Sequence, residues 1–303
     1  MTTHSLARRL GACLIGLLAA LPLSSCLSAD SFFFNYKAVD GYDWDADPPD
    51  PDLEGDMGPA HPSMIGPDNR VEGFIELADR EVHYVYAHRD DALATIFYSH
   101  GNYANLGWYW QRVELMWSWG YNVMIYDYPA YGLSTGEPSE QTMYENAEAA
   151  LELLPTLPGV DPDRVFFIGF SLGGAPASEM AVRAQRGETT LKPRGLLTES
   201  AFCSAETIVQ DGTWLNLPGE FLVDGAFDNC ERMAILDPGL KRVIMHGAYD
   251  GFVVPVHAEK LKRAAGDAAT LVIFEGEGAE HGELPLHDPA RYEAVYREFL
   301  ALE

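Results

Sequence analysis

The segment Gly169-Phe170-Ser171-Leu172-Gly173 matches the pattern G-x-S-x-G. An apolar run, Arg164–Ile168, comes directly before it, and a stretch rich in small residues follows it. This is the order of strand, sharp turn and helix that exposes a nucleophilic serine at the end of a sheet. Such a turn strains the backbone at the serine, and glycines on either side let neighbouring chains approach closely. The segment therefore predicts Ser171 as a nucleophile rather than as an ordinary helix N-cap.

A serine nucleophile needs a histidine base and an orienting carboxylate, in the chain order serine, acid, histidine for this kind of turn. Asp250 lies just past the apolar run Arg242–Met245, although an Asp before Gly251 also suits a simple turn. His281 lies in a glycine-rich loop after the last apolar run, and His287 farther along is the alternative base. We expect Asp250 and His281 to complete the catalytic group.

Two backbone N–H groups are expected to bind the oxyanion that forms during attack. Ser99-His100-Gly101-Asn102 ends another predicted strand, so the N–H of Asn102, with Tyr103 as the alternative, can act together with that of Leu172. His100 precedes the serine, which is the wrong order for the base, and we interpret it as a structural residue that holds this loop.

Short β-rich runs alternate with helical stretches from residue 70 onward, as expected for a mostly parallel sheet with helices on both faces. Residues 70–303 are predicted as one domain, and residues 200–237 as a covering excursion that breaks the alternation. Eight strands are predicted: Val71–Leu77, Glu81–His88, Thr95–Ser99, Asn122–Tyr126, Arg164–Ile168, Gly195–Thr198, Arg242–Met245 and Thr270–Phe274. Five helices are predicted: Trp108–Trp119, Glu140–Leu154, Leu172–Gln185, Val256–Ala265 and Pro289–Leu300.

These motifs together resemble the α/β-hydrolase superfamily, and within it the Bem46 group. The resemblance runs from about Val71 to the C-terminus and includes the stretch Tyr126–Gly136 besides the segments already quoted. It implies an α/β-hydrolase fold. The chain departs from the group at Pro129-Ala130, where relatives often carry glycine in the second position. Asp127, in the same stretch, is expected to bind loop backbone.

The first 25 residues indicate a signal peptide. Arg8 and Arg9 precede an apolar run of 14 residues, Leu10–Leu23, which is too short to cross a bilayer as a helix. Leu23-Ser24-Ser25-Cys26 then resembles the lipobox of bacterial lipoproteins, which implies a lipid on Cys26. By the same resemblance Leu27 favours an outer membrane. Residues 26–69 are predicted as a tether, because the stretch 40–59 holds eight acids and almost no aliphatic residue.

Composition limits the partners further. The chain has 20 Lys and Arg against 46 Asp and Glu, a balance that disfavours nucleic acid. The sequence shows neither HExxH nor CxxC, so no metal or organic cofactor is expected. After export, Cys203 and Cys230 are expected to form a disulfide, with two free buried thiols as the alternative.

The sequence thus predicts a lipid-anchored serine hydrolase that cleaves a small-molecule or lipid-like ester or thioester through an acyl-enzyme. Two alternatives stay open. One is a peptidase or amidase of the same fold, because these enzymes share the triad geometry. The other is a surface lipoprotein that has lost catalysis and binds a partner through residues 200–237.

Overall fold

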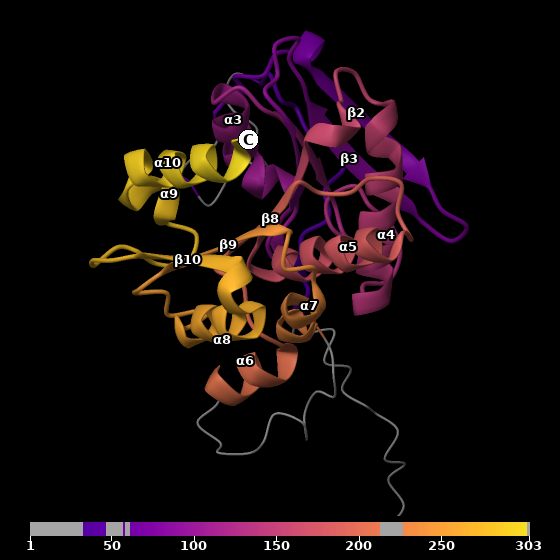
Figure 1. The fold of residues 1–303 in the computed structure, drawn as a ribbon. Coiled ribbons are helices and arrows are strands. Elements are labelled where there is room, and N and C mark those ends of the chain that lie inside the picture. Colours follow the sequence, from indigo (N-terminus) through magenta and orange to yellow (C-terminus); the bar gives the residue numbers. More distant parts are fainter. Residues whose placement is uncertain (1–32, 47–56, 58–60, 213–226, 302–303) are drawn as a thin grey trace, which may run out of the picture.

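The computed structural model describes residues 33–46, 57, 61–212 and 227–301 of the 303-residue chain. Its centre is an eight-stranded sheet with the order β10-β9-β8-β7-β4-β6-β3-β2 (Figure 1). Strands from β10 to β6 run parallel to their neighbours, whereas β3 pairs antiparallel with both β6 and β2. All eight predicted strands are present: β2 (Arg70–Glu76), β3 (Glu81–Ala87), β4 (Thr95–Ser99), β6 (Asn122–Tyr126), β7 (Val165–Phe170), β8 (Gly195–Glu199), β9 (Lys241–Gly247) and β10 (Ala269–Phe274).

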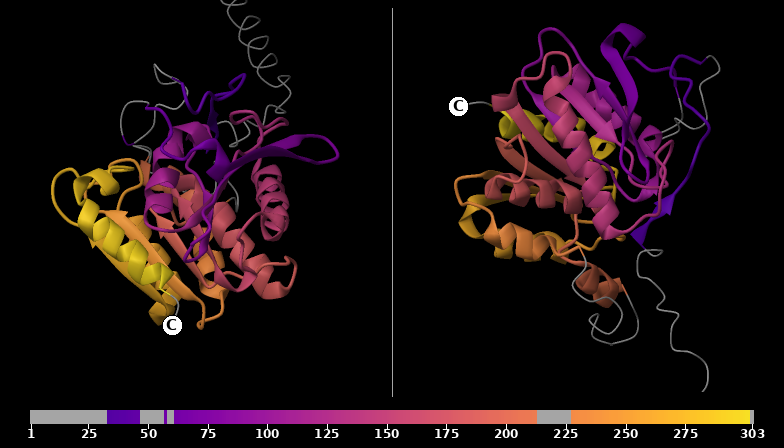
Figure 2. Two further views of the ribbon diagram at one scale, coloured as in Figure 1. Left: turned by 90° about the horizontal axis from the view of Figure 1, so that it is seen from above. Right: turned by 90° about the vertical axis from the view of Figure 1, so that its right-hand side faces the viewer.

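Helices cover both faces of this sheet (Figure 2). On one face lie α3 (Trp110–Ser118) and α10 (Pro289–Leu300), and on the other α4 (Glu140–Leu153), α5 (Gly174–Arg186) and α8 (Val256–Ala265). The predicted helix Leu172–Gln185 differs slightly, because a 3₁₀ turn over Ser171–Gly173 precedes α5. The short helix α9 (Leu284–His287) was not predicted.

Alternation along the strands divides the apolar side chains between two cores. On β4 and β7, Phe97 and Phe167 point to the face of α5, with ring centroids 5.5 Å apart, while Ile96 and Ile168 point to the face of α3. All four side chains are buried. Successive side chains of a strand point to opposite faces of the sheet. Because β4 and β7 carry apolar side chains toward both faces, each strand is buried on both faces.

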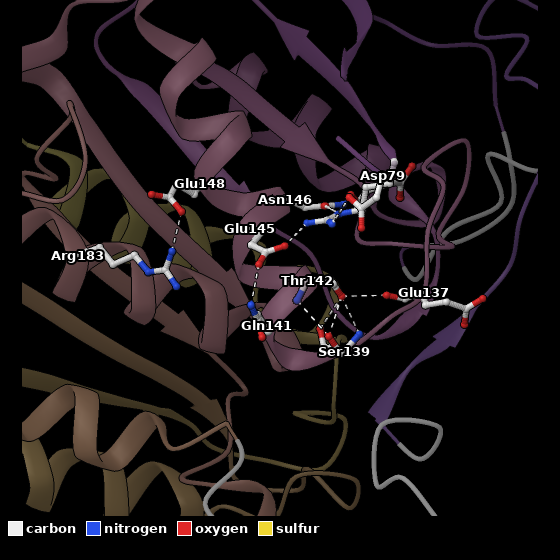
Figure 3. Close-up of polar contacts among 11 residues, drawn as sticks. Asp79, Glu137, Ser139, Gln141, Thr142, Glu145, Asn146, Glu148 and Arg183 are labelled. Carbon is white, nitrogen blue, oxygen red and sulfur yellow. Dashed lines mark hydrogen bonds and ion pairs between the residues drawn. The ribbon is translucent and has the colours of Figure 1, made fainter. Parts of the chain in front are cut away.

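Helix α4 fixes the loop that follows β6. It begins at a capping box, in which the Ser139 Oγ accepts from the Thr142 N–H and the Thr142 Oγ1 accepts from the Ser139 N–H (Figure 3). In its middle, the Asn146 Nδ2 donates to the Asp127 carbonyl at 3.2 Å, and the Arg80 Nε donates to the Asn146 Oδ1 at 2.8 Å. The helix therefore holds the backbone of Asp127 in place.

The prediction of a tether over 26–69 is wrong for its described parts, residues 33–46, 57 and 61–69, several of which pack on the domain. Phe33, Phe34, Trp44 and Ile65 are buried. The Trp44 ring lies 4.4 Å from that of Trp110, and its Nε1 donates to Glu72. The tether was predicted from the many acids and few aliphatic residues of this stretch. The prediction failed because a few large aromatic residues supply enough apolar area to pack on the domain.

The signal peptide 1–25 and Cys26 lie outside the described residues. Among the helices that the structure describes, none is long and apolar enough to cross a membrane.

The excursion at 200–237 carries α6 (Ala205–Gly212) and α7 (Asn229–Ile235) in its described parts. Helix α7 packs against α5 and α8. The structure contains the predicted disulfide between Cys203 and Cys230, whose Cα atoms are 4.9 Å apart. The bridge joins the start of the excursion to α7.

Candidate active site

Ser171 sits at the tight turn between β7 and α5. Its backbone has φ +52°, a left-handed conformation that costs a non-glycine residue about 1–3 kcal/mol, and the residue is 4% exposed. The flanking glycines make the turn possible. A Cβ on Gly169 would overlap the carbonyl of Gly173, and a Cβ on Gly173 would overlap the carbonyl of Ser99. The strain is therefore held by close backbone packing on both sides.

The structure brings Ser171, His281 and Asp250 together from three separate loops. The His281 Nε2 lies 3.1 Å from the Ser171 Oγ, and the His281 Nδ1 lies 2.8 Å from the Asp250 Oδ2. The alternative base, His287, instead lies 2.9 Å from the Glu275 carbonyl through its Nε2. The arrangement can pass the proton of the serine hydroxyl to His281 while the carboxylate holds the other ring nitrogen.

Asp250 is held as a carboxylate. Burial raises its pKa, but hydrogen bonding and charge from His281 outweigh that effect, so the pKa lies below its usual value. Its Oδ1 accepts the N–H groups of Phe252 at 3.0 Å and Val253 at 2.8 Å. Behind it, burial lowers the pKa of His246, whose Nε2–H donates to the Val253 carbonyl. His246 was not among the residues predicted to belong to this group.

The predicted oxyanion donors line the same cavity as Ser171. Leu172 is the second residue of the 3₁₀ turn, where the N–H has no carbonyl within the turn to bind. Asn102 also lines the cavity, whereas the alternative donor, Tyr103, already gives its N–H to the Tyr109 hydroxyl at 3.2 Å. The geometry therefore favours Asn102 over Tyr103 as the partner of Leu172.

A buried cluster of ionisable groups supports the loop that carries Asn102. The Asp127 Oδ1 accepts the Leu106 N–H at 2.8 Å, as expected of a residue that binds loop backbone, and lies 3.4 Å from the His100 Nε2. His83 lies between Asp127 and Glu72, with nitrogen–oxygen distances of 3.3 and 2.8 Å. Burial lowers the pKa of His83, but the two carboxylates outweigh this and raise it to about 8.

This cluster predicts a loss of stability at alkaline pH. The pKa of His83 is raised from 6.5 to about 8. The contribution of protonated His83 to the free energy of unfolding is therefore fully present below pH 6.5 and disappears as pH rises through 8. We expect the free energy of unfolding to fall by about 2 kcal/mol over that interval. Urea titrations at pH 6 and 9 measure this, and His83→Asn should flatten the difference. An unchanged pH dependence in that variant would contradict the assignment.

A second buried network holds the loop of His281, and sequence reasoning missed it. The Arg112 guanidinium is paired with Glu199 at 2.9 Å and donates to the Gly282 carbonyl at 2.7 Å. Both side chains are almost fully buried, and the Tyr292 hydroxyl donates to the second carboxylate oxygen of Glu199. The available sequence signals were an arginine inside an apolar helix and a glutamate at the end of a buried strand.

Breaking this ion pair should be costly. Arg112→Met leaves the Glu199 carboxylate buried without its partner, so we expect a loss of about 3–5 kcal/mol in the free energy of unfolding. The double variant Arg112→Met/Glu199→Leu removes both charges and should recover most of that loss. Urea unfolding of both single variants and the double variant measures the coupling. Additive effects in the double variant would show that the pair is not coupled.

A cavity of about 800 Å³ opens at Ser171, Leu172 and His281. Its lining is largely aromatic, and the excursion contributes Phe202 and Ile208. Among the described residues, no group of three or more His, Cys, Asp or Glu side chains is arranged to hold a metal ion.

Comparison with known proteins agrees with the architecture. Residues 96–238 match the model of the alpha/beta hydrolase family. This match and the strand order show that the chain has the α/β-hydrolase fold. YfhR of Escherichia coli K12 is 28% identical over 190 residues, which span 62% of this chain and 64% of YfhR. The alpha/beta hydrolase domain-containing protein aho-3 of Caenorhabditis elegans is 29% identical over 69% of this chain and 58% of its own length. The chain thus matches somewhat less than two thirds of these relatives.

Solved structures share the same α/β-hydrolase fold. An alpha-beta hydrolase from Vibrio vulnificus superposes with a TM-score of 0.62 at 17% identity, covering 75% of this chain and 80% of that one. An esterase from Pyrococcus furiosus superposes with a TM-score of 0.61 at 17% identity, covering 76% and 89% of the two chains. At these identities the likeness establishes the fold alone.

Proposed function

We propose that this α/β hydrolase is a serine esterase or thioesterase that works through Ser171, His281 and Asp250. The observation that carries the proposal is the continuous hydrogen-bonded chain from the Ser171 Oγ to the Asp250 carboxylate, which opens into an apolar cavity. The esterase from Pyrococcus furiosus and a carboxyl esterase from Tuber melanosporum, with a TM-score of 0.57, share the fold and support an ester substrate.

In the proposed mechanism, the His281 Nε2 takes the hydroxyl proton as the Ser171 Oγ attacks the carbonyl carbon. The N–H groups of Leu172 and Asn102 stabilise the resulting oxyanion. His281 then gives the proton to the departing alcohol or thiol, which leaves an acyl group on Ser171. Water, deprotonated by His281, attacks this acyl-enzyme, and His281 returns the proton to the Ser171 Oγ as the carboxylic acid leaves. Asp250 keeps the Nδ1 protonated throughout, so that the Nε2 is free to accept.

Rapid mixing with p-nitrophenyl esters tests this function. We expect a burst of p-nitrophenolate close to one equivalent per enzyme, followed by slower steady turnover as the acyl-enzyme is hydrolysed. Burst and turnover should both be absent in Ser171→Ala. A wild-type protein without ester turnover would favour the alternative of a scaffold that binds a partner.

We also propose that the chain is a member of the Bem46 group and is exported with a lipid on Cys26. Seven residue steps separate Cys26 from Phe33, which lines the cavity. An extended chain covers at most about 3.6 Å per residue, so an anchored Cys26 would keep the cavity within roughly 25 Å of the membrane surface. Such a position suits a lipid-like ester substrate.

Cys26→Ser is expected to abolish incorporation of labelled palmitate and to release the protein into the soluble fraction. The reason is that Cys26 is the proposed acylation site, and the 14-residue apolar run before it is too short to span a bilayer. Metabolic labelling and fractionation of cells measure both effects. Cys13→Ser is the matched control and should keep the label. Wild-type protein that is soluble and unlabelled would contradict the anchor.

A further inference from the structure

One wall of the cavity comes from residues that precede the hydrolase sheet. Phe33, Phe34 and Asn35 line it together with Ser171 and His281. We call residues 33–37 the pocket strap. The pocket strap lies more than 130 positions before Ser171 in sequence. The mechanism described above makes no use of its residues.

The pocket strap is hydrogen-bonded to the loop that carries the oxyanion donor. Its strand β1 (Asn35–Tyr36) pairs in parallel with β5 (Tyr103–Ala104). The Asn35 N–H donates to the Asn102 carbonyl at 3.1 Å, and the Asn102 side chain donates to the Phe33 carbonyl at 3.4 Å. These bonds fix the position of the strap relative to Ser171.

Aromatic packing fixes the side chains of the pocket strap as well. The Phe33 ring lies 6.0 Å from that of Phe202 and 5.2 Å from that of Phe227, both from the excursion at 200–237. The Phe34 ring lies 6.0 Å from Phe227 and 6.4 Å from Tyr131. Phe33 and Phe34 are only 4% and 5% exposed. A pre-formed wall of this kind favours an apolar ligand group, because burial removes its apolar surface from water without ordering the wall anew.

The residue types that line the cavity restrict further which acyl groups it can bind. Eight of the lining residues are Phe, Tyr or Trp, and Glu283 is the charged carboxylate among them. The described lining residues include no lysine or arginine, so a carboxylate at the far end of a substrate would find no cation there. A cavity of about 800 Å³ also far exceeds the needs of an acetyl group.

We infer that the pocket strap completes the binding site for the acyl group of the substrate, and that this group is uncharged, apolar and of medium length, on the order of eight carbons. Phe33 is the specificity-determining residue. This inference rests on the proposed esterase function and adds to it the class of acyl group.

The test compares kcat/KM for p-nitrophenyl octanoate, p-nitrophenyl acetate and mono-p-nitrophenyl suberate, an ester of the same length that ends in a carboxylate. We expect the wild type to favour the octanoate over each of the others by at least about 10-fold. Phe33→Ala should lower the preference for octanoate over acetate by about 10-fold, with the acetate rate changed less than about 3-fold. Phe33→Leu should retain most of the preference.

The exposed Phe74 on β2 supplies the matched control, because Phe74→Ala removes the same ring outside the cavity. The preference of Phe74→Ala for octanoate over acetate should equal that of the wild type. If Phe33→Ala does not fold, Phe33→Trp still alters the wall, and its preference for octanoate over acetate must then differ from that of Phe74→Ala. An equal loss for all esters in Phe33→Ala, or a wild type that prefers acetate or suberate, would overturn the inference. Acetate turnover that depends on Ser171 would leave the esterase function standing in that case, whereas no turnover of any ester would count against both.

Discussion

Ser171→Ala is expected to lower kcat for ester hydrolysis by at least about 10⁴-fold while the free energy of unfolding changes by less than about 1 kcal/mol. The variant lacks the oxygen that we propose as the nucleophile, and neither His281 nor the proposed oxyanion donors can replace it. The stability should be nearly unchanged because the substitution removes one small polar atom at a site whose backbone is strained. Steady-state kinetics and thermal unfolding measure the two effects.

Ser178→Ala is the matched control for that variant. Ser178 is also buried and lies on α5, but its hydroxyl bonds the Ala175 carbonyl and Asn229 and it does not line the cavity. Its activity should remain within a few-fold of the wild type. If Ser171→Ala kept a tenth or more of the wild-type activity, another residue would have to be the nucleophile.

Asp250→Asn should lower kcat by about 10⁴-fold because it fixes the wrong tautomer of His281. The Asp250 Oδ1 accepts two backbone N–H groups, so an asparagine there would keep its carbonyl oxygen at that position. Its NH₂ group would then face the His281 Nδ1, which would have to accept a hydrogen bond from it and so could not carry a proton. The Nε2 would carry the proton and could not take one from Ser171.

The measurement is the pH dependence of kcat/KM for Asp250→Asn beside Asp267→Asn, an exposed control. The control should match the wild type at every pH. A loss of less than about 10-fold in Asp250→Asn at neutral pH would mean that Asp250 does not orient the base.

The sheet could be predicted well because buried parallel strands are continuous apolar runs and the helices between them are long. The 3₁₀ turn at Ser171–Gly173 was harder to foresee, because helical periodicity does not distinguish this turn from the helix α5 that follows it. The departure at Pro129-Ala130 now has a structural meaning. Ala130 adopts φ +69°, a conformation that glycine takes without steric cost.

The site was predictable where a motif fixes the local geometry and not where distant segments meet. Ser171, Asp250 and His281 each lie in the turn or loop directly after a strand, where the sequence motifs place them. The pairing of Arg112 with Glu199 could not be predicted, because it depends on how α3 packs near the end of β8. The contribution of Phe33 to the cavity also depends on packing against Phe202 and Phe227, which are distant in sequence. Strands of two residues, such as β1 and β5, are too short to show any periodicity.

The most direct test of the catalytic assignment is to locate a covalent adduct. The purified protein is treated with a fluorophosphonate probe and digested, and the modified peptide is identified by mass spectrometry. The account predicts one equivalent of probe on Ser171, at a rate that falls sharply in His281→Ala. A protein that stays unlabelled, or one that carries the probe on another residue, would contradict it.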